Sequence, residues 1–230
     1  MRTFLTAAAI FLLAGPAGAA TRNFGVTGFE KVRIEGPYKV VLTTGVAPFA
    51  RATGSAAALD RIAMDVRGNV LVVHSNISAW GSEPSKAGSQ VEISLGTHDL
   101  SAAWLTGAGT LSINRVKGLS FDLSSQGSGG VEIGRIDVDQ LNVGVIGTAR
   151  AVLAGTVGKI TAVVRGVSSL DASGLAAKDA VLAGEGAATI SAKVTNTVKV
   201  DGNGPVAVTL TGGPACTLRL YGSASVSGCR

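Results

Sequence analysis

Glycine-led turns recur at an almost constant spacing along residues 100–226, and this repetition restricts the fold more than any other feature of the sequence. Each turn reads Gly-x-Gly, Gly-x-Ala or Gly-x-Ser. The leading glycines are Gly107, Gly127, Gly147, Gly166, Gly184, Gly202 and Gly222, with spacings of 20, 20, 19, 18, 18 and 20 residues. Self-similarity at a fixed period of about 20 residues is typical of a solenoid, in which every repeat forms one coil.

Residues on either side of the turns form columns when the repeats are aligned. Four columns are apolar, with Ser125 and Gly228 as the exceptions. The column two residues before the turns contains Leu105, Ser125, Val145, Val164, Leu182, Val200 and Leu220. A polar or small column beside the apolar ones contains Ala102, Asp122, Asn142, Thr161, Asp179, Thr197 and Thr217. Alternation with a period of two predicts half-buried strands, so each repeat should contain two short strands joined at a glycine corner. A looser apolar column indicates a third wall and contains Val116, Ile136, Val157, Leu175 and Val194.

Coils stacked at a constant period place like residues over like residues. The inner columns then form one continuous core, and no coil can bury its apolar face alone. Parallel crossover connections are overwhelmingly right-handed. We therefore predict an all-β fold, a right-handed parallel β-helix (solenoid) with about 18–20 residues per coil. An antiparallel β-sandwich with regular turns is the alternative that the alternation leaves open.

Residues 1–20 have the pattern of a secretory signal peptide. Arg2 supplies the positive n-region, residues 4–13 form an apolar run, and residues 17–19 (Ala-Gly-Ala) form a small-residue cleavage site. No later apolar run is long enough to span a membrane, so we expect no transmembrane segment. The protein should be exported to the periplasm or the extracellular space of a Gram-negative bacterium. The remaining residues 21–230 suffice for a single well-cored domain.

The first part of this domain follows the repeat poorly. Residues 21–90 contain several alternating segments and a polar stretch at 76–90, so we expect N-terminal capping strands and a loop. The loop is either a functional segment on a rigid scaffold or a plain surface excursion. Residues 91–93 match residues 111–113 one period earlier, which predicts that the regular coils occupy residues 91–230.

Two cysteines, Cys216 and Cys229, lie in the last repeat. An even pair in an exported chain indicates a disulfide, and it would staple a coil that has a neighbour on one side only. A metal site is the competing interpretation, but neither histidine is near in sequence. Without Arg2 the chain has 19 basic and 15 acidic residues, a net charge of +4. The basic residues are scattered and aromatic residues are few, so we expect no nucleic-acid binding.

No sequence pattern supports catalysis or a cofactor. The chain lacks a Gly-x-Ser-x-Gly elbow, a phosphate-binding loop and a Gly-x-Gly-x-x-Gly motif, and His74 and His98 are not spaced as zinc ligands. The alignment places Asp122 and Asp179 in one outward column three coils apart, about 14 Å, which is too far for a paired acid and base. We therefore predict no catalytic residues, no metal ligands and no cofactor.

Trp104 is the main candidate for ligand binding. The alternation of its strand places the side chain on the outer face, where an aromatic ring could stack on a sugar or anchor a partner. The aligned repeats put it in an outward column that contains Trp104, Ser124, Gly144, Val163, Val181, Lys199 and Arg219. Alternatively, Trp80 or the loop around it folds back and covers Trp104. In both cases Trp80 and Trp104 share one wall, and they are the candidate binding residues for an envelope polysaccharide or a protein.

Several motifs carry a family resemblance. They are Phe29-x-x-Val32-x-Ile34-x-Gly36, Val40-x-Leu42-x-x-Gly45, Ile62…Val66-x-Gly68-x-x-Leu71-x-Val73 and Cys216…Cys229. Together with the Gly-x-Gly corners they resemble the bacterial head GIN domain of putative autotransporter adhesins, over nearly all of residues 21–230. The resemblance implies a right-handed β-helix without catalytic residues, because members of this family lack an established biochemical activity. A self-exporting autotransporter needs a translocator barrel of many strands, and we expect no room for one in this chain.

These observations predict a non-enzymatic exported solenoid that binds or organises a component of the cell envelope. The alternative is a carbohydrate-active β-helix enzyme, similar to a polysaccharide lyase or hydrolase, with its site near Trp80 and Trp104. Clustered carboxylates beside an open groove would favour the enzyme. Formation of a homo-oligomer through an exposed strand wall or end is a third, structural option.

Overall fold

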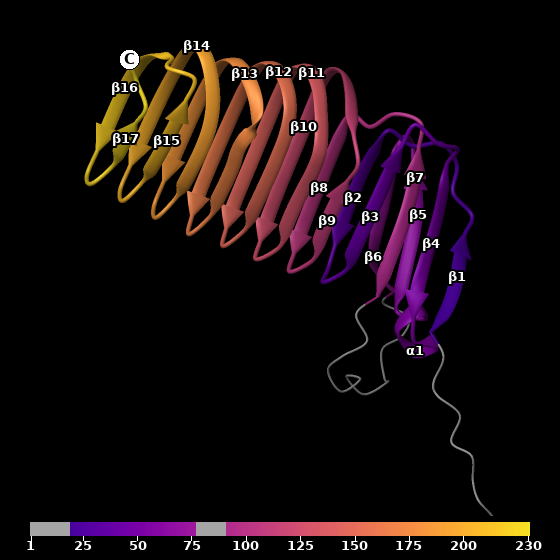
Figure 1. Ribbon diagram of the computed structural model, residues 1–230. Helices are drawn as coiled ribbons and strands as arrows, with labels where there is room; N and C mark the ends of the chain where they lie inside the picture. The colour runs from indigo at the N-terminus through magenta and orange to yellow at the C-terminus, as the bar shows by residue number, and fades with distance from the viewer. Residues whose placement is uncertain (1–18, 77–90) are drawn as a thin grey trace, which may run out of the picture.

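The computed structural model describes residues 19–76 and 91–230, and its strands form one continuous sheet that winds into stacked coils (Figure 1). The predicted signal peptide lies almost entirely outside the described residues, and so does Trp80 with the loop around it. Among the described residues the only helix is the four-residue α1, Ala56–Leu59, which begins after the capping side chain of Ser55. No helix in this part of the chain is long and apolar enough to cross a membrane.

The strands shorter than ten residues lie toward the two ends of the chain. They are β1 (Ala20–Phe24), β2 (Lys31–Glu35), β3 (Lys39–Thr44), β4 (Phe49–Gly54), β5 (Ile62–Arg67), β6 (Val70–Ser75), β7 (Glu92–Thr97), β8 (Ala102–Gly107), β9 (Thr110–Ile113), β15 (Ala207–Thr211), β16 (Ala215–Tyr221) and β17 (Ser225–Ser227). The longer strands bend around most of a coil each. They are β10 (Val116–Gly127), β11 (Gly130–Gly147), β12 (Arg150–Gly166), β13 (Ser169–Glu185) and β14 (Thr189–Asn203).

Every pairing from β8 to β17 is parallel, and each coil lies directly on the next. In β11, for example, Val131 lies between Leu111 of β9 and Ala151 of β12. The predicted β-solenoid of stacked parallel coils is therefore confirmed, and the antiparallel sandwich is excluded.

The core is built from the inward-facing columns that the alternation predicts. The five apolar residues proposed for a third wall are all buried, with exposed fractions of 0–1%. Phe121 is the largest fully buried side chain, and the inner columns above and below it are mostly Val, Ile, Leu and Ala. Stacking buries these faces continuously along the solenoid axis, so the coils stabilise one another rather than folding singly.

The predicted register of two coils is wrong by two residues. Gly184 and Gly202 were aligned with the turns, but Gly184 pairs with Val164 inside the strands. The turns are instead made by Gly186 and Gly204, which have φ angles of +81° and +92°. These are left-handed conformations that residues with a Cβ adopt at a steric cost. A two-residue shift keeps inward residues inward, so the alternation could not reveal it.

The same shift separates two carboxyl groups that the alignment had placed in one column. Asp122 pairs with Asn142, whereas Asp179 pairs with Lys159 and Thr197. The expectation that Asp122 and Asp179 share a column is therefore wrong, and the two residues occupy neighbouring outward columns.

The N-terminal strands are interleaved with later ones, which contradicts the predicted start of the regular stack. Strand β3 lies between β7 and β9, and Val40 pairs with both Ile93 and Leu111. Strand β2 likewise lies between β6 and β8. Residues 91–93 are thus not the direct neighbours of residues 111–113. The earlier strands β2 and β3 therefore form the inner coil, next to β8 and β9, and the later strands β6 and β7 pair with the outer edge of that coil.

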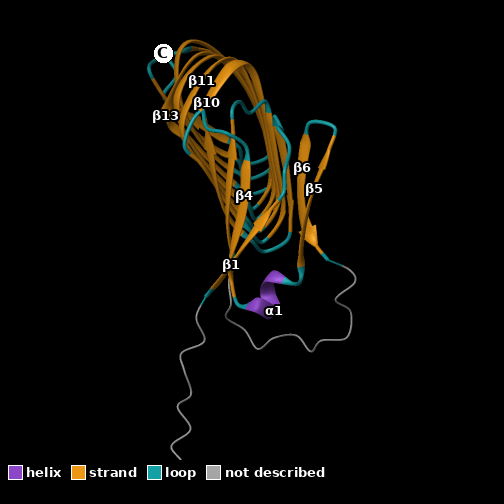
Figure 2. Ribbon diagram, turned by 90° about the vertical axis from the view of Figure 1, so that its right-hand side faces the viewer, coloured by secondary structure: helices purple, strands orange, loops and turns teal. Residues whose placement is uncertain are grey.

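The end of the solenoid beyond β6 and β7 is closed by antiparallel strands. Strand β4 pairs with β7, β1 pairs with β4, and the hairpin partner β5 pairs with β6 (Figure 2). At the opposite end, Cys216 and Cys229 form a disulfide with a Cα–Cα distance of 5.8 Å. Among the described residues β16 pairs with β14 and β17 with β15, each on one edge, so this bond ties down the terminal coil.

Candidate functional site

Trp104 and Tyr221 lie on the same outer wall of the solenoid, in two adjacent columns of outward-facing residues. We call these two columns the Trp104 wall. Strand pairing defines its first column as Arg33, Trp104, Ser124, Gly144, Val163, Ala183, Asp201 and Arg219. The second column, two residues further along each strand, is Glu35, Thr106, Gln126, Ile146, Arg165, Glu185, Asn203 and Tyr221. All of these side chains are exposed or half-buried, because they alternate with the core residues of the same strands.

Trp104 lies half-buried on this wall, as the alternation predicts. The guanidinium carbon of Arg33 lies 5.5 Å from the centroid of its ring, a cation–π contact on one side. Ser124, on the next coil, is a much smaller neighbour. A surface hollow of about 230 Å³ lies at this point and is lined by Arg33, Glu35, Trp104, Thr106, Ser124 and Gln126. Arg33 therefore holds the ring, and the short Ser124 leaves space beside it.

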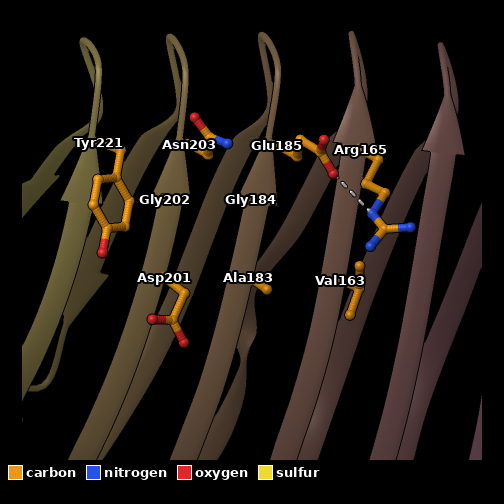
Figure 3. Close-up of a pocket in the computed structure, with 9 residues that line it drawn as sticks. All are labelled: Val163, Arg165, Ala183, Gly184, Glu185, Asp201, Gly202, Asn203 and Tyr221. Atoms are coloured by element: carbon orange, nitrogen blue, oxygen red, sulfur yellow. Dashed lines mark ion pairs between the residues drawn. The ribbon is translucent and has the colours of Figure 1, made fainter.

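A second and larger hollow lies on the same wall near the C-terminal end, and we call it the Tyr221 groove (Figure 3). It has a volume of about 350 Å³. Arg165, Glu185, Asn203 and Tyr221 stand in one row on successive coils, and Val163, Ala183 and Asp201 form the row below (Figure 3). Gly184 and Gly202 also line the groove with their backbones, but both are inward-facing positions, where an added Cβ would point at Val206 and Ala224 rather than into the groove.

Arg165, Glu185 and Asn203 of the Tyr221 groove are exposed and Asp201 is half-buried, so these polar groups can meet a ligand in solvent. The Nε atom of Arg165 lies 3.2 Å from a carboxylate oxygen of Glu185, with side-chain exposures of 57% and 61%. Tyr221 is 66% exposed. An aromatic ring beside carboxylate, amide and guanidinium groups offers both a stacking face and many hydrogen-bonding atoms.

Two further carboxyl groups are held by local hydrogen bonds away from the Trp104 wall. The side chain of Thr197 donates to Asp179 at 2.5 Å, and this bond is the main cause that lowers the pKa of Asp179. Hydrogen bonds from the side chain and backbone of Ser173 lower the pKa of Asp171 in the same way. Lowered pKa values favour the ionised form, which is opposite to what a general acid needs.

Neither histidine lines the hollow at Trp104 or the Tyr221 groove, although His74 lines a further hollow with Arg33 and Glu35 at the N-terminal end of the wall. His74 of β6 pairs with Asp65 of β5 at 3.0 Å, and His98 follows β7 as an exposed residue. Within residues 19–76 and 91–230 no group of three or more His, Cys, Asp or Glu side chains is arranged to hold a metal ion.

The sequence located Trp104 on the wall but missed the Tyr221 groove. The outward column that pointed to Trp104 was followed only to Arg219, and Tyr221 is the next outward residue on the same strand. The predicted register also placed Val181 and Lys199 where Ala183 and Asp201 stand. An alignment anchored on Gly186 and Gly204 would have gathered the groove residues.

The fold and the wall define an all-β solenoid whose candidate sites are open hollows on its outer face. A sequence profile described as "Putative auto-transporter adhesin, head GIN domain" matches residues 28–214. This match covers most of the chain, so the protein belongs to the head GIN domain family. No functionally curated protein matches the sequence.

Solved structures share this architecture at low sequence identity. A putative adhesin from Bacteroides fragilis NCTC 9343 is similar with a TM-score of 0.81 and 20% identity, over 91% of this chain and 95% of that chain. A putative lipid binding protein from Parabacteroides distasonis ATCC 8503 is similar with a TM-score of 0.72 and 19% identity, over 92% of this chain and 97% of that chain. A putative adhesin from Parabacteroides merdae ATCC 43184 is similar with a TM-score of 0.69 and 15% identity, over 92% of this chain and 96% of that chain. At these identities the likeness establishes the fold.

Proposed function

We propose that this protein is an exported, non-enzymatic binding domain of the bacterial envelope that binds carbohydrate on the Trp104 wall. Export rests on the signal-peptide pattern of residues 1–20 and on membership of an adhesin-type family. The observation that carries carbohydrate binding is the half-exposed ring of Trp104, held by Arg33 in a surface hollow. An indole ring held at one face of a flat wall can stack on the apolar face of a sugar ring.

The surrounding polar groups fit the same ligand class. Glu35, Thr106 and Gln126 line the hollow with Trp104 and supply acceptors and donors for sugar hydroxyls. Exposed polar groups of this kind cost little to leave unpaired in the free protein, because water satisfies them. One similar structure is named a putative lipid binding protein, but the apolar inward columns of this solenoid pack against one another, and the hollows of the Trp104 wall carry charged and polar side chains.

A carbohydrate-active enzyme is the second candidate, and one observation favours it. Glu185 and Asp201 lie on adjacent coils in the Tyr221 groove, which brings two carboxyl groups to one open surface. A glycosidase acid, however, works from a site withdrawn from water, and Glu185 is 61% exposed and paired with Arg165. Binding without turnover therefore fits this wall better.

The test is a glycan-array screen of the mature protein beside Trp104→Ala and the control Leu119→Ala. Leu119 is 78% exposed and lies outside the Trp104 wall, so it reports on nonspecific loss of exposed apolar surface. We expect saturable binding that the Trp104 variant lowers about 3- to 10-fold and that the control leaves unchanged. Circular dichroism should show the same β-signal in all three proteins.

Two results would count against the proposal. Wild-type protein with no binding above background would remove the carbohydrate interpretation altogether. Release of reducing or unsaturated sugar ends from a bound glycan, abolished in Glu185→Gln or Asp201→Asn, would replace the binding domain with the enzyme.

A further inference from the structure

We infer that the Trp104 wall binds a long, uncharged polysaccharide chain, with the Tyr221 groove as a second subsite for the same chain. The inference rests on the proposed function, since it extends carbohydrate binding from one hollow to two. It differs from that function in naming the ligand as a neutral polymer and in assigning Tyr221, Asn203 and Asp201 to its recognition.

The two hollows lie on one continuous track. Trp104 and Arg219 belong to the same column, and Tyr221 belongs to the adjacent one, so no corner of the solenoid separates the sites. Six strand-to-strand steps lead from β8 to β16 through β10 to β14. At about 4.8 Å per step, the sites are roughly 29 Å apart. A disaccharide cannot span that distance, whereas an extended chain of many sugars can.

The first column of the wall is low between the two aromatic rings, which suits a chain lying along it. Ser124 lines the Trp104 hollow, Val163 and Ala183 line the Tyr221 groove, and Gly144 lies on the coil between the two hollows. None of these residues has a long side chain. Ile146 of the second column is 37% exposed and adds an apolar contact. A polymer can therefore run along the first column past short side chains, with Gln126, Arg165 and Glu185 of the second column beside it.

The charges of the wall balance, which favours an uncharged ligand. Its two columns contain three basic side chains, Arg33, Arg165 and Arg219, and three acidic ones, Glu35, Glu185 and Asp201. Arg165 and Glu185 already form an ion pair. An acidic polysaccharide would meet as many repulsive as attractive groups and would gain little electrostatic attraction.

The Tyr221 groove has the composition of a sugar subsite in its own right. The exposed Tyr221 ring provides the stacking face, and the Asn203 amide and Asp201 carboxylate provide donors and acceptors beside it.

The experiment uses isothermal titration with neutral β-1,4-glucans, β-1,3-glucans, mannans, galactans and chitin oligomers, each as disaccharide and octasaccharide. Polygalacturonate and alginate serve as acidic probes. We expect at least one neutral octasaccharide to bind about tenfold or more tightly than its disaccharide, since two linked contacts act together. Tyr221→Ala should lower octasaccharide affinity about 3- to 10-fold and should leave binding of the disaccharide at Trp104 unchanged.

Matched variants separate this inference from the proposed function. Tyr221→Phe keeps the ring and should retain most of the octasaccharide affinity, and Leu119→Ala should retain all of it. If Tyr221→Ala has no effect, or if length has none, the two-site inference fails while carbohydrate binding at Trp104 stands. Tighter binding of the acidic probes would overturn the assignment of a neutral ligand. Absence of binding across the whole panel would remove both proposals together.

Discussion

The disulfide between Cys216 and Cys229 should control the local stability of the last coil and little else. The two cysteines are 13 residues apart, so the closed loop contains about 14 residues. The loss of chain entropy in the unfolded state then corresponds to roughly 3 kcal/mol, or about a 100-fold change in an opening equilibrium. That is a large fraction of what holds this coil. In the part of the chain that the structure describes, β16 pairs with β14 alone, and Leu218 and Leu220 are 43% and 38% exposed.

The assay is hydrogen–deuterium exchange on the wild type and the double variant Cys216→Ser, Cys229→Ser. We expect amide protection to fall about 100-fold in β16 and β17 and to stay unchanged in β11 to β13, since coils contact only their neighbours. Equal loss of protection along the whole solenoid would refute the view that the last coil can open while the other coils stay folded. Unchanged protection in β16 would refute the assigned role of the disulfide.

Three further predictions concern the core, a corner and the hairpin β5–β6. The Ser125 hydroxyl is buried without a hydrogen-bond partner among the described residues. Ser125→Ala should therefore raise the free energy of unfolding, measured in urea, by about 1 kcal/mol. A lower free energy of unfolding would show that the hydroxyl has a partner. Gly155 has a φ of +129°, and Gly155→Ala would bring a Cβ to 2.1 Å from the backbone oxygen of Ile136. It should therefore destabilise the protein by more than about 1 kcal/mol in the same assay. An unchanged urea midpoint would contradict the pairing of Gly155 with Ile136. The hydrogen bond to Asp65, aided by the Ser75 carbonyl, raises the pKa of His74 above its usual 6.5. Its stabilising effect is therefore complete below pH 6.5 and is lost as the pH rises through the raised pKa. Hydrogen exchange in β5 and β6 should quicken over that range in the wild type and show no such step in Asp65→Asn.

Much of the fold follows from local rules that a sequence displays directly. Alternation of apolar and polar residues fixes which side chains point inward, so the outward position of Trp104 and the buried third wall could be predicted without coordinates. The recurring glycine turns fixed the coil length and the parallel stacking, because only a constant period lets like residues lie over like residues.

Register within the stack depended on the tertiary structure. Inward and outward positions repeat every two residues, so a two-residue shift leaves every apolar residue facing inward, and the apolar–polar pattern fits both registers equally well. The corners at Gly186 and Gly204 decide between the two alignments, and they bring Ala183 and Asp201 into the Tyr221 groove in place of Val181 and Lys199.

The order of the N-terminal strands was likewise beyond the sequence. Both edges of β3 can accept a parallel partner, and nothing in its own residues says that residues 92–97 will lie on one side and residues 110–113 on the other. Periodicity reports only how far apart similar residues lie along the chain. Strand pairing depends on contacts between distant segments, and these exist only once the solenoid has closed. The sequence by itself therefore determined the kind of coil and the faces of its strands, and the tertiary structure decided which coils are neighbours and which side chains meet on the outer wall.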